Sequence, residues 1–151
     1  MFWRIPLSDA RYACGRVLQV EAGSRVTILA GLMSWVGASP PDSAGLAGST
    51  VVSQGTAHVK TITETGGEIL GYRDLALDDI EPLPMLSHSW PTGVRLPSGF
   101  EPPKARLVNG FHDVREATAR EIESLPALSA WGYKVIQAEA ENYFVAKTTH
   151  A

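Results

Sequence analysis

Apolar and polar positions alternate along the N-terminal part of the chain with the two-residue period of β-strands. Residues 3–7 show this alternation, and Pro6 confines the strand to an edge or an end because proline cannot donate a ladder hydrogen bond. Further strands are predicted over 12–21 and 25–36, each preceded by a short turn. Both faces of 25–36 are apolar, so this strand should be central. Three strands joined by short turns are expected to pair as an antiparallel meander.

The middle of the chain has a weaker and less regular pattern. Residues 37–48 are rich in Gly, Ala, Ser and Pro, which predicts a surface loop with few side chains to pack. Short strands are predicted over 49–53 and 68–73. Residues 56–65 are ambiguous, because two apolar residues there have helical spacing while the β-branched density favours an extended strand.

Helical signals are confined to the C-terminal part of the chain. Six prolines between residues 82 and 103 exclude a long helix or a central strand there and predict an extended connection. Beyond it, residues 118–121 read Thr-Ala-Arg-Glu, which matches a capping box and predicts a short helix to about Leu125. Apolar residues over 135–144 recur on one helical stripe and predict a second helix, with a terminal strand over 143–146 as the alternative.

The order of these elements and the composition together predict one α+β domain. Strands come first and helices last, which is typical of helices packed on one side of a sheet. We therefore expect an N-terminal antiparallel, curved and partly barrel-like sheet, with short C-terminal helices packed on it. The length of 151 residues suits one domain over 1–151, and a hydrophobic content of 44% is enough for its core.

Composition also limits the environment and the partners. The 13 basic and 16 acidic residues give a formal net charge of −3, which disfavours nucleic acid as a direct partner. The N-terminus lacks the pattern of a secretory signal, and the most apolar run, 26–38, is shorter than a membrane-spanning helix. Cys14 is the only cysteine, so an internal disulfide is impossible and a reducing compartment is favoured. We expect a cytosolic protein without a membrane partner.

The motifs of the common enzyme classes are missing from the sequence. It contains no phosphate-binding loop, no Gly-x-Gly-x-x-Gly turn and no Gly-x-Ser-x-Gly elbow. Its histidines are too far apart to share a helix face as zinc ligands. The neighbours His112 and Asp113 would point apart on a strand or a helix, which favours polar loop residues near a helix start. We expect no catalysis, no cofactor and no metal, with an enzyme site of His112, Asp113 or Cys14 at the mouth of the sheet as the alternative.

Acidic residues are concentrated in one segment. Between residues 64 and 81, six acids accompany a single base, Arg73. Such a cluster is most often a solvated surface, but it also suits a patch that steers a basic protein partner into contact. Trp90 and Trp131 are candidate anchors of such an interface, with core packing as the alternative. The candidate contact residues are Glu68, Asp74, Asp78, Asp79 and Glu81.

One stretch resembles a known family. Residues 3–18 read Trp-Arg-Ile-Pro-Leu-Ser-Asp-Ala-Arg-Tyr-Ala-Cys-Gly-Arg-Val-Leu. This resembles the opening of the immunity protein 26 family of bacterial polymorphic toxin systems, in which an Ile-Pro-Leu strand, an Asp-Gly turn, an aromatic residue and a Gly-Arg-Val strand follow in that order. Residues 68–73 and 117–121 are compatible with later parts of the family. The residues that carry the motif are Ile5, Pro6, Leu7, Asp9, Arg11, Tyr12, Gly15 and Arg16.

The motif has a structural interpretation and two departures from the family pattern. We expect an edge strand, a tight turn, and a Gly15 that lets the backbone or a large side chain approach closely. Ala10 stands where the family usually has glycine, so a turn requiring a positive φ would be strained there. Cys14 occupies a position that is often aromatic.

The resemblance implies a cytosolic antitoxin that binds a cognate protein toxin and blocks it without turnover of its own. The sequence does not indicate the toxin's activity, the mode of inhibition or the oligomeric state. A small enzyme and a general protein-interaction module are the alternative functions.

Overall fold

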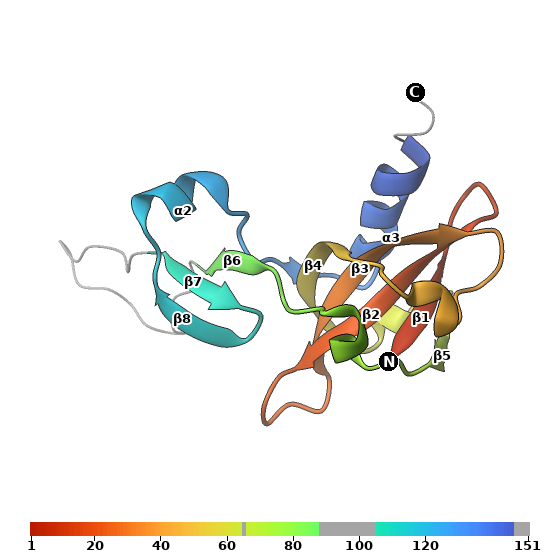
Figure 1. Cartoon of the computed structure of the whole chain (residues 1–151), viewed down its shortest axis with the longest axis horizontal. Coiled ribbons are helices and arrows are strands. Elements are labelled where there is room, and N and C mark those ends of the chain that lie inside the picture. The colour runs from red at the N-terminus through yellow and green to blue at the C-terminus, as the bar shows by residue number, and fades with distance from the viewer. Residues whose placement is uncertain (65, 88–104, 147–151) are drawn as a thin grey trace. The chain divides into compact units, whose positions relative to one another are not determined.

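The chain divides into two compact units in the computed structural model, which describes residues 1–64, 66–87 and 105–146. One unit comprises Met1–Pro82 and Ser129–Ala151, and the other comprises Leu83–Leu128 (Figure 1). The larger unit holds a six-stranded sheet and the smaller unit a three-stranded sheet.

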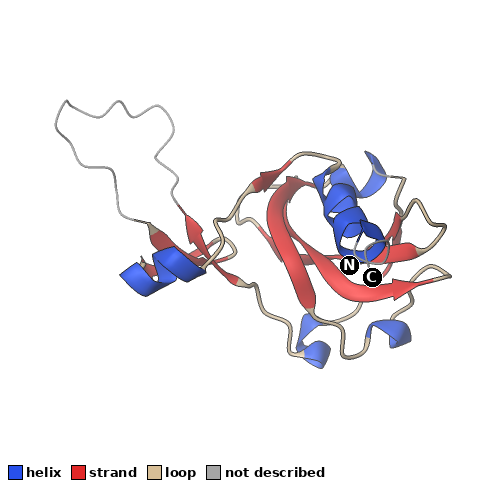
Figure 2. Ribbon diagram, turned by 90° about the horizontal axis from the view of Figure 1, so that it is seen from above, coloured by secondary structure: helices blue, strands red, loops and turns tan. Residues whose placement is uncertain are grey.

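The six-stranded sheet begins with the predicted antiparallel meander. Strands β1 (Phe2–Pro6), β2 (Tyr12–Val20), β3 (Thr27–Gly37) and β4 (Val51–His58) pair in sequence order, and β3 lies centrally between β2 and β4. β5 (Ile69–Gly71) pairs with β1 at one edge. The two-residue β9 (Ala130–Trp131) pairs in parallel with β4 at the other edge. The sheet is curved but not closed into a barrel (Figure 2), so the α+β prediction is confirmed in its class and its curvature.

Short helices complete this unit. α1 (Thr61–Glu64) resolves the ambiguous segment, which is strand up to His58 and then helical. α3 (Val135–Ala140) continues into the π-helical segment η3 (Glu141–Ala146), so the alternative of a terminal strand over 143–146 is wrong. The apolar stripe predicted over residues 135–144 is confirmed, because Ile136, Ala140 and Phe144 are buried against the sheet.

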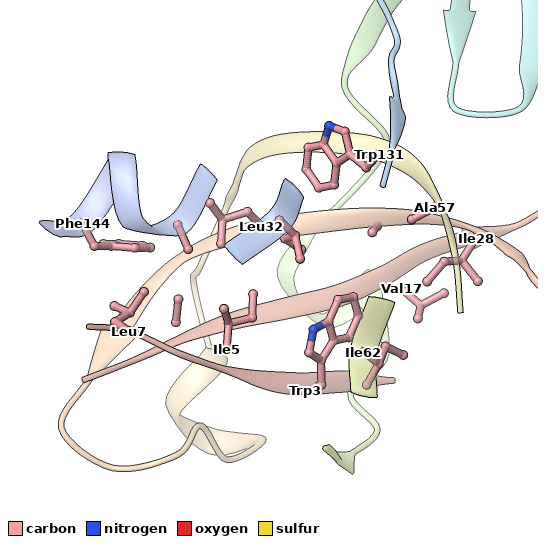
Figure 3. Close-up of a cluster of buried hydrophobic side chains, with 14 residues drawn as sticks. Trp3, Ile5, Leu7, Val17, Ile28, Leu32, Ala57, Ile62, Trp131 and Phe144 are labelled. Carbon is pink, nitrogen blue, oxygen red and sulfur yellow. The ribbon is translucent and has the colours of Figure 1, made fainter. Parts of the chain in front are cut away.

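The main core lies between this sheet and helices α1 and α3. Figure 3 shows Trp3 and Ile5 on β1 and Leu7 directly after it, with Phe144 on η3 and Ile62 on α1. The predicted close approach to Gly15 is present, because a Cβ at that position would overlap the indole of Trp3. The indole of Trp131 covers Gly55 of β4 in the same way. Trp131 is therefore a core residue, whereas Trp90 lies outside the described residues.

A second apolar cluster contains side chains of β1, β2 and β3 that alternate with those of the main core. Phe2, Cys14 and Met33 pack there with Leu46 of the short helix η1 (Ala44–Leu46). Leu46 is 0% exposed. Residues 37–48 are otherwise mostly exposed, as expected of a surface loop with few side chains to pack, and this one leucine packs the loop against the sheet.

The turn between β1 and β2 is tied to the C-terminal helical segment. Ser8 donates to the Glu141 carboxylate from its backbone N (2.6 Å) and its hydroxyl (2.8 Å). Arg11 pairs with Asp9 and donates to the carbonyl of Phe144. Ala10 has a φ of 68°, the positive value that glycine adopts more readily. The motif residues of this turn therefore have structural roles.

The smaller unit consists of a three-stranded antiparallel sheet and a helix. β7 (Arg106–Asn109) pairs with β6 (Pro84–Ser87) on one side and β8 (His112–Glu116) on the other. β6 begins at a proline and lies at an edge, whereas 88–103 of the predicted extended connection falls outside the described residues. α2 (Ala119–Ser124) begins with the predicted capping box, in which Thr118 and Glu121 bond reciprocally.

The interpretation of His112 and Asp113 as loop residues near a helix start is wrong. They are the first two residues of β8, and a two-residue hairpin joins β7 to β8. Gly110, at the first position of that hairpin, has a φ of 63°, which suits a type II′ turn and favours glycine. Gly110 is a local sequence signal of this turn, whereas the residues of β8 that follow it are mostly polar and exposed.

Candidate partner-binding surface

A buried network of three charged side chains lies beneath the acidic segment. Arg16 of β2 is 1% exposed and donates from Nη1 to Oδ2 of Asp78 at 2.9 Å. Arg73 donates two hydrogen bonds to the same carboxylate, from Nε to Oδ2 at 2.8 Å and from Nη2 to Oδ1 at 2.9 Å. The Asp78 side chain is only 1% exposed. Asp78 is the last residue of the short helix η2 (Leu75–Asp78), and its carboxylate is the shared acceptor of two guanidinium groups.

The same network joins three separate segments of the larger unit. Arg16 also donates to the backbone carbonyl of Arg73 (2.8 Å), and Arg73 donates to the carbonyl of Ser43 (3.1 Å). The backbone N of Gly48 donates to Oδ1 of Asp78 (3.3 Å). Strand β2, the 43–48 loop and the 73–78 segment are therefore bonded to one carboxylate, which holds the surface above it in a defined position.

The pKa of Asp78 is lowered well below its ordinary value. The hydrogen bonds from Arg73 are the largest cause; burial opposes them, and the bonds from Arg16 and the Gly48 amide act in the same direction as Arg73. The carboxylate is thus ionised inside the protein. Asp78 was expected on the contact surface, and the structure corrects this, since a buried and fully bonded carboxylate does not face a partner.

A small pocket opens beside this network. It has a volume of about 280 Å³ and lies between the end of β2 and the segment that follows β5. Its lining is mostly apolar, with contributions from Met1, Val17, Leu18, Val20 and Leu75. Tyr72 forms another part of the wall, and its side chain is 71% exposed.

Three exposed apolar side chains line the pocket, and two more lie in the stretch of chain that forms one of its walls. Met1, Val20 and Tyr72 line it, and all three are exposed. Ile69 of β5 and Leu77 of η2 are exposed within the same stretch of chain as Tyr72. Exposed apolar groups that gather around a hollow are typical of a binding surface, whereas scattered ones need no explanation. We call these five residues the apolar pocket surface: Met1, Val20, Ile69, Tyr72 and Leu77.

The four remaining acidic candidates are exposed in this part of the larger unit. Asp74 lines the pocket and caps η2 by accepting from the Ala76 amide at 3.0 Å. Asp79 ends η2 with a φ of 52°. Glu81 is exposed, and Glu68 forms a 3.5 Å ion pair with Arg4. The structure thus brings exposed acids and exposed apolar groups together along residues 68–81.

Of the residues proposed for the alternative enzyme, Cys14 belongs to the larger unit, and His112 and Asp113 belong to the smaller unit. Cys14 is 0% exposed, and burial raises its pKa to about 12, so its thiol is not activated. Asp113 is exposed and pairs with Arg106 at 3.0 Å, while His112 belongs to the same strand. In the parts of the chain that the structure describes, no three His, Cys, Asp or Glu side chains are grouped as metal ligands.

Sequence reasoning selected the acids of this surface but missed its apolar members. Tyr72 and Leu77 lie among these acids in the sequence, but a count of charged residues does not indicate them as contact residues. Val20 is the last residue of β2, and the pairing of β2 with β1 extends only to Arg16. The exposure of Val20 therefore depends on the strand register, which the sequence alone does not give. Comparison with protein families, with curated proteins and with solved structures finds no match. Within the described ranges, no helix has the length and apolar character needed to cross a membrane.

Proposed function

We propose that this protein is an immunity protein that binds a cognate bacterial toxin in the cytosol and neutralises it. The observation that supports this proposal best is the apolar pocket surface, with its exposed acids, fixed above the Arg16–Asp78–Arg73 network. The resemblance of residues 3–18 to the opening of the immunity protein 26 family supplies the kind of partner.

Binding fits this surface better than catalysis does. Pockets that hold small molecules commonly enclose about 300–1,000 Å³. This one is smaller, at about 280 Å³, and its two charged lining residues both have structural partners. Arg73 is bonded to Asp78, and Asp74 caps η2. The pocket therefore suits one or two side chains of a protein partner.

Neutralisation requires only that the complex be stable and that it block the toxin. An inhibitory interface buries about 1,200–2,000 Å² in total, with a few apolar or aromatic anchors at its centre and polar groups at the rim. Tyr72 and Leu77 are suitable anchors, being 71% and 66% exposed. Asp74, Asp79 and Glu81 would steer a basic toxin surface toward them.

Co-expression tests the proposal directly. A candidate toxin, if one is encoded beside the gene for this chain, is expressed in a bacterial host with and without the protein, and growth and co-purification are measured. The variant Y72S/L77S should lose both rescue and co-purification. The matched variant V114S/I122S removes two similarly exposed apolar side chains from the smaller unit and should retain both. Failure of the wild-type protein to rescue growth or to bind the toxin would refute the proposal.

The acidic rim has its own test in the same complex. The variant D74N/D79N/E81Q removes three charges, and it keeps both a cap for η2 and a residue tolerated at positive φ. We expect slower association with the toxin and a weaker salt dependence. The control E64Q/E116Q/E123Q removes three other exposed charges and should leave both unchanged. If the two variants showed the same association rate and the same salt dependence, Asp74, Asp79 and Glu81 would not be part of the interface.

A further inference from the structure

The cations of the larger unit divide into paired and unpaired ones. Within the part of this unit that the structure describes, ion pairs with acids are formed by Arg4, Arg11, Arg16 and Arg73. The other cations described there are exposed and form no ion pair: Arg25, Lys60 and Lys134. A single exposed cation without a partner is common, because surface ion pairs contribute little stability. The positions of the three in the fold therefore decide whether they have a shared role.

Arg25 and Lys60 flank one backbone hydrogen bond at the end of the sheet. Beyond the last ladder pair of β3 and β4, the Val59 amide donates to the Val26 carbonyl at 2.7 Å. Arg25 is the neighbour of Val26 in the sequence, and Lys60 is the neighbour of Val59. Because the two chains run antiparallel here, the backbones of Arg25 and Lys60 lie next to each other.

Lys134 joins them from the C-terminal part of the chain. The hydroxyl of Thr61, the residue after Lys60, donates to the carbonyl of Tyr133 at 2.7 Å. Thr61 is 1% exposed, so this hydrogen bond is buried and fixes the segment that carries Lys134 beside Lys60. The three unpaired cations therefore lie on neighbouring segments. We define the cationic corner as Arg25, Val26, Lys60, Tyr133 and Lys134.

Two exposed side chains of the corner supply non-polar contact area. Val26 and Tyr133 are each 43% exposed. The ring of Tyr133 lies edge-on to the ring of His58, with 5.8 Å between their centroids. The Nδ1 atom of His58 in turn accepts from the Lys60 amide at 3.0 Å. Tyrosine and arginine are enriched among the residues that contribute most to protein interfaces, and here both occur beside an exposed valine.

The charges around the corner favour a protein partner over a nucleic acid. Two exposed acids are near it, Glu21 before the β3 strand and Glu64 one turn after Lys60 on α1. The formal net charge of the whole chain is −3. A phosphate backbone, with a negative charge at every nucleotide, would meet these acids as well as the cations. A protein segment with two or three carboxylates can place them at the cations alone.

We propose that the cationic corner binds a second protein through a segment in which acidic side chains stand beside an apolar or aromatic one. The carboxylates would pair with Arg25, Lys60 and Lys134, and the apolar residue would contact Tyr133 and Val26. This inference is independent of the proposed function. The corner lies on the β3–β4 side of the sheet, whereas the apolar pocket surface lies along β2 and β5 and is accompanied by acids.

Two charge variants and three labelled probes test the proposal by fluorescence anisotropy. The probes are a short peptide rich in Glu and Phe, the same peptide with Gln in place of Glu, and an oligothymidine of the same charge as the first. R25Q/K60Q/K134Q removes the three cations of the corner. The matched variant R106Q/R115Q/R120Q removes three exposed cations of the smaller unit and has the same net charge. Circular dichroism checks that both variants are folded.

We expect the Glu peptide to bind the wild type and to bind R25Q/K60Q/K134Q at least about tenfold more weakly. The matched variant should lose less than about twofold, and added salt should weaken wild-type binding. Tyr133→Ser should weaken binding by about threefold or more, whereas Tyr133→Phe, which keeps the ring, should have a smaller effect.

Four results would overturn the proposal. If the Glu peptide failed to bind, or bound no more tightly than the Gln peptide, the corner would not recognise acidic segments. Equal losses in the two charge variants would place the contact elsewhere. Tighter binding of the oligothymidine than of the Glu peptide would make nucleic acid the partner. Self-association of the wild type that is lost in R25Q/K60Q/K134Q, measured by sedimentation, would make a second copy of this chain the partner.

Discussion

Arg16 donates to Asp78 across 62 positions of sequence, at 2.9 Å between Nη1 and Oδ2, with both side chains only 1% exposed. Arg73, five residues before Asp78, completes the pair into a network of two guanidinium groups and one carboxylate. A buried charge is stable only when it is paired and hydrogen-bonded, and here four donors meet the carboxylate. The network therefore links β2 to the segment that carries the candidate surface.

Replacing Asp78 with asparagine should destabilise the larger unit strongly. The substitution keeps the size of the side chain but leaves the buried guanidinium group of Arg16 and the partly buried one of Arg73 without a counter-charge. We expect the free energy of unfolding to fall by about 3 kcal/mol in urea titration. Asp79→Asn, one residue away and exposed, should change it by less than about 0.5 kcal/mol. A small effect of Asp78→Asn would mean that solvent reaches the network freely.

The same carboxylate gives the protein an acid-sensitive contribution to stability. The folded pKa of Asp78 is lowered, chiefly by Arg73, so the folded state binds its proton less readily than the unfolded state does. Its contribution is complete above the unfolded value near 4, and it is lost as the pH falls below that value toward the folded pKa. Urea midpoints of wild type and Asp78→Asn should therefore converge between about pH 4 and pH 2. Parallel curves over this range would contradict the assignment.

Ala10→Gly should stabilise the protein. Ala10 has a φ of 68°, where a side chain is strained and glycine is not. We expect the free energy of unfolding to rise by about 1 kcal/mol, measured by urea or thermal unfolding. Ala22→Gly provides the matched control, because Ala22 lies in the next turn with no positive φ, and it should give no gain. A loss of stability in Ala10→Gly would show that residue 10 does not adopt a positive φ in the turn between β1 and β2.

Gly15→Ala should be destabilising because of Trp3. The added Cβ would overlap the buried indole, which must then move within a packed core. We expect a loss of about 1–3 kcal/mol by urea unfolding, and partial recovery when Trp3→Leu is added to Gly15→Ala. Gly132→Ala should be nearly neutral, since only Val135 lies within 4 Å of the added carbon. If the effects of Gly15→Ala and Trp3→Leu on the free energy of unfolding were strictly additive, this would argue against direct contact between residues 15 and 3.

Glu121 should titrate well below an ordinary glutamate. The bonds from Arg115 lower its pKa to about 2, with the Thr118 backbone amide adding to the effect. NMR titration of the side-chain carboxyl signal measures this pKa. Arg115→Gln should raise it toward the usual value, whereas Arg120→Gln, which removes another exposed cation of the same unit, should leave it in place. If the pKa of Glu121 were unchanged in Arg115→Gln, the hydrogen bonds of the capping box alone would account for its low pKa.

Local signals in the sequence were sufficient for several elements of both units. The two-residue alternation predicted the meander, and the capping box predicted the start of α2. These features depend on neighbours in sequence, which is why they are readable without a structure. The hairpin of β7 and β8 was missed because its strands are short and β8 is exposed at every position. Without a buried face, its apolar alternation is too weak to detect.

The candidate surface divides in the same way. The sequence by itself determined that acids gather over residues 64–81 and that Gly15 permits the backbone or a large side chain to approach closely. Only the tertiary structure decided that Asp78 belongs to the interior while Asp74 and Asp79 remain exposed, because Arg16 comes from a distant strand. It also decided that Val20 lies beyond the end of β1, since strand register depends on long-range pairing. Composition along the chain records which groups are present, whereas burial and pairing arise from contacts between residues far apart in sequence.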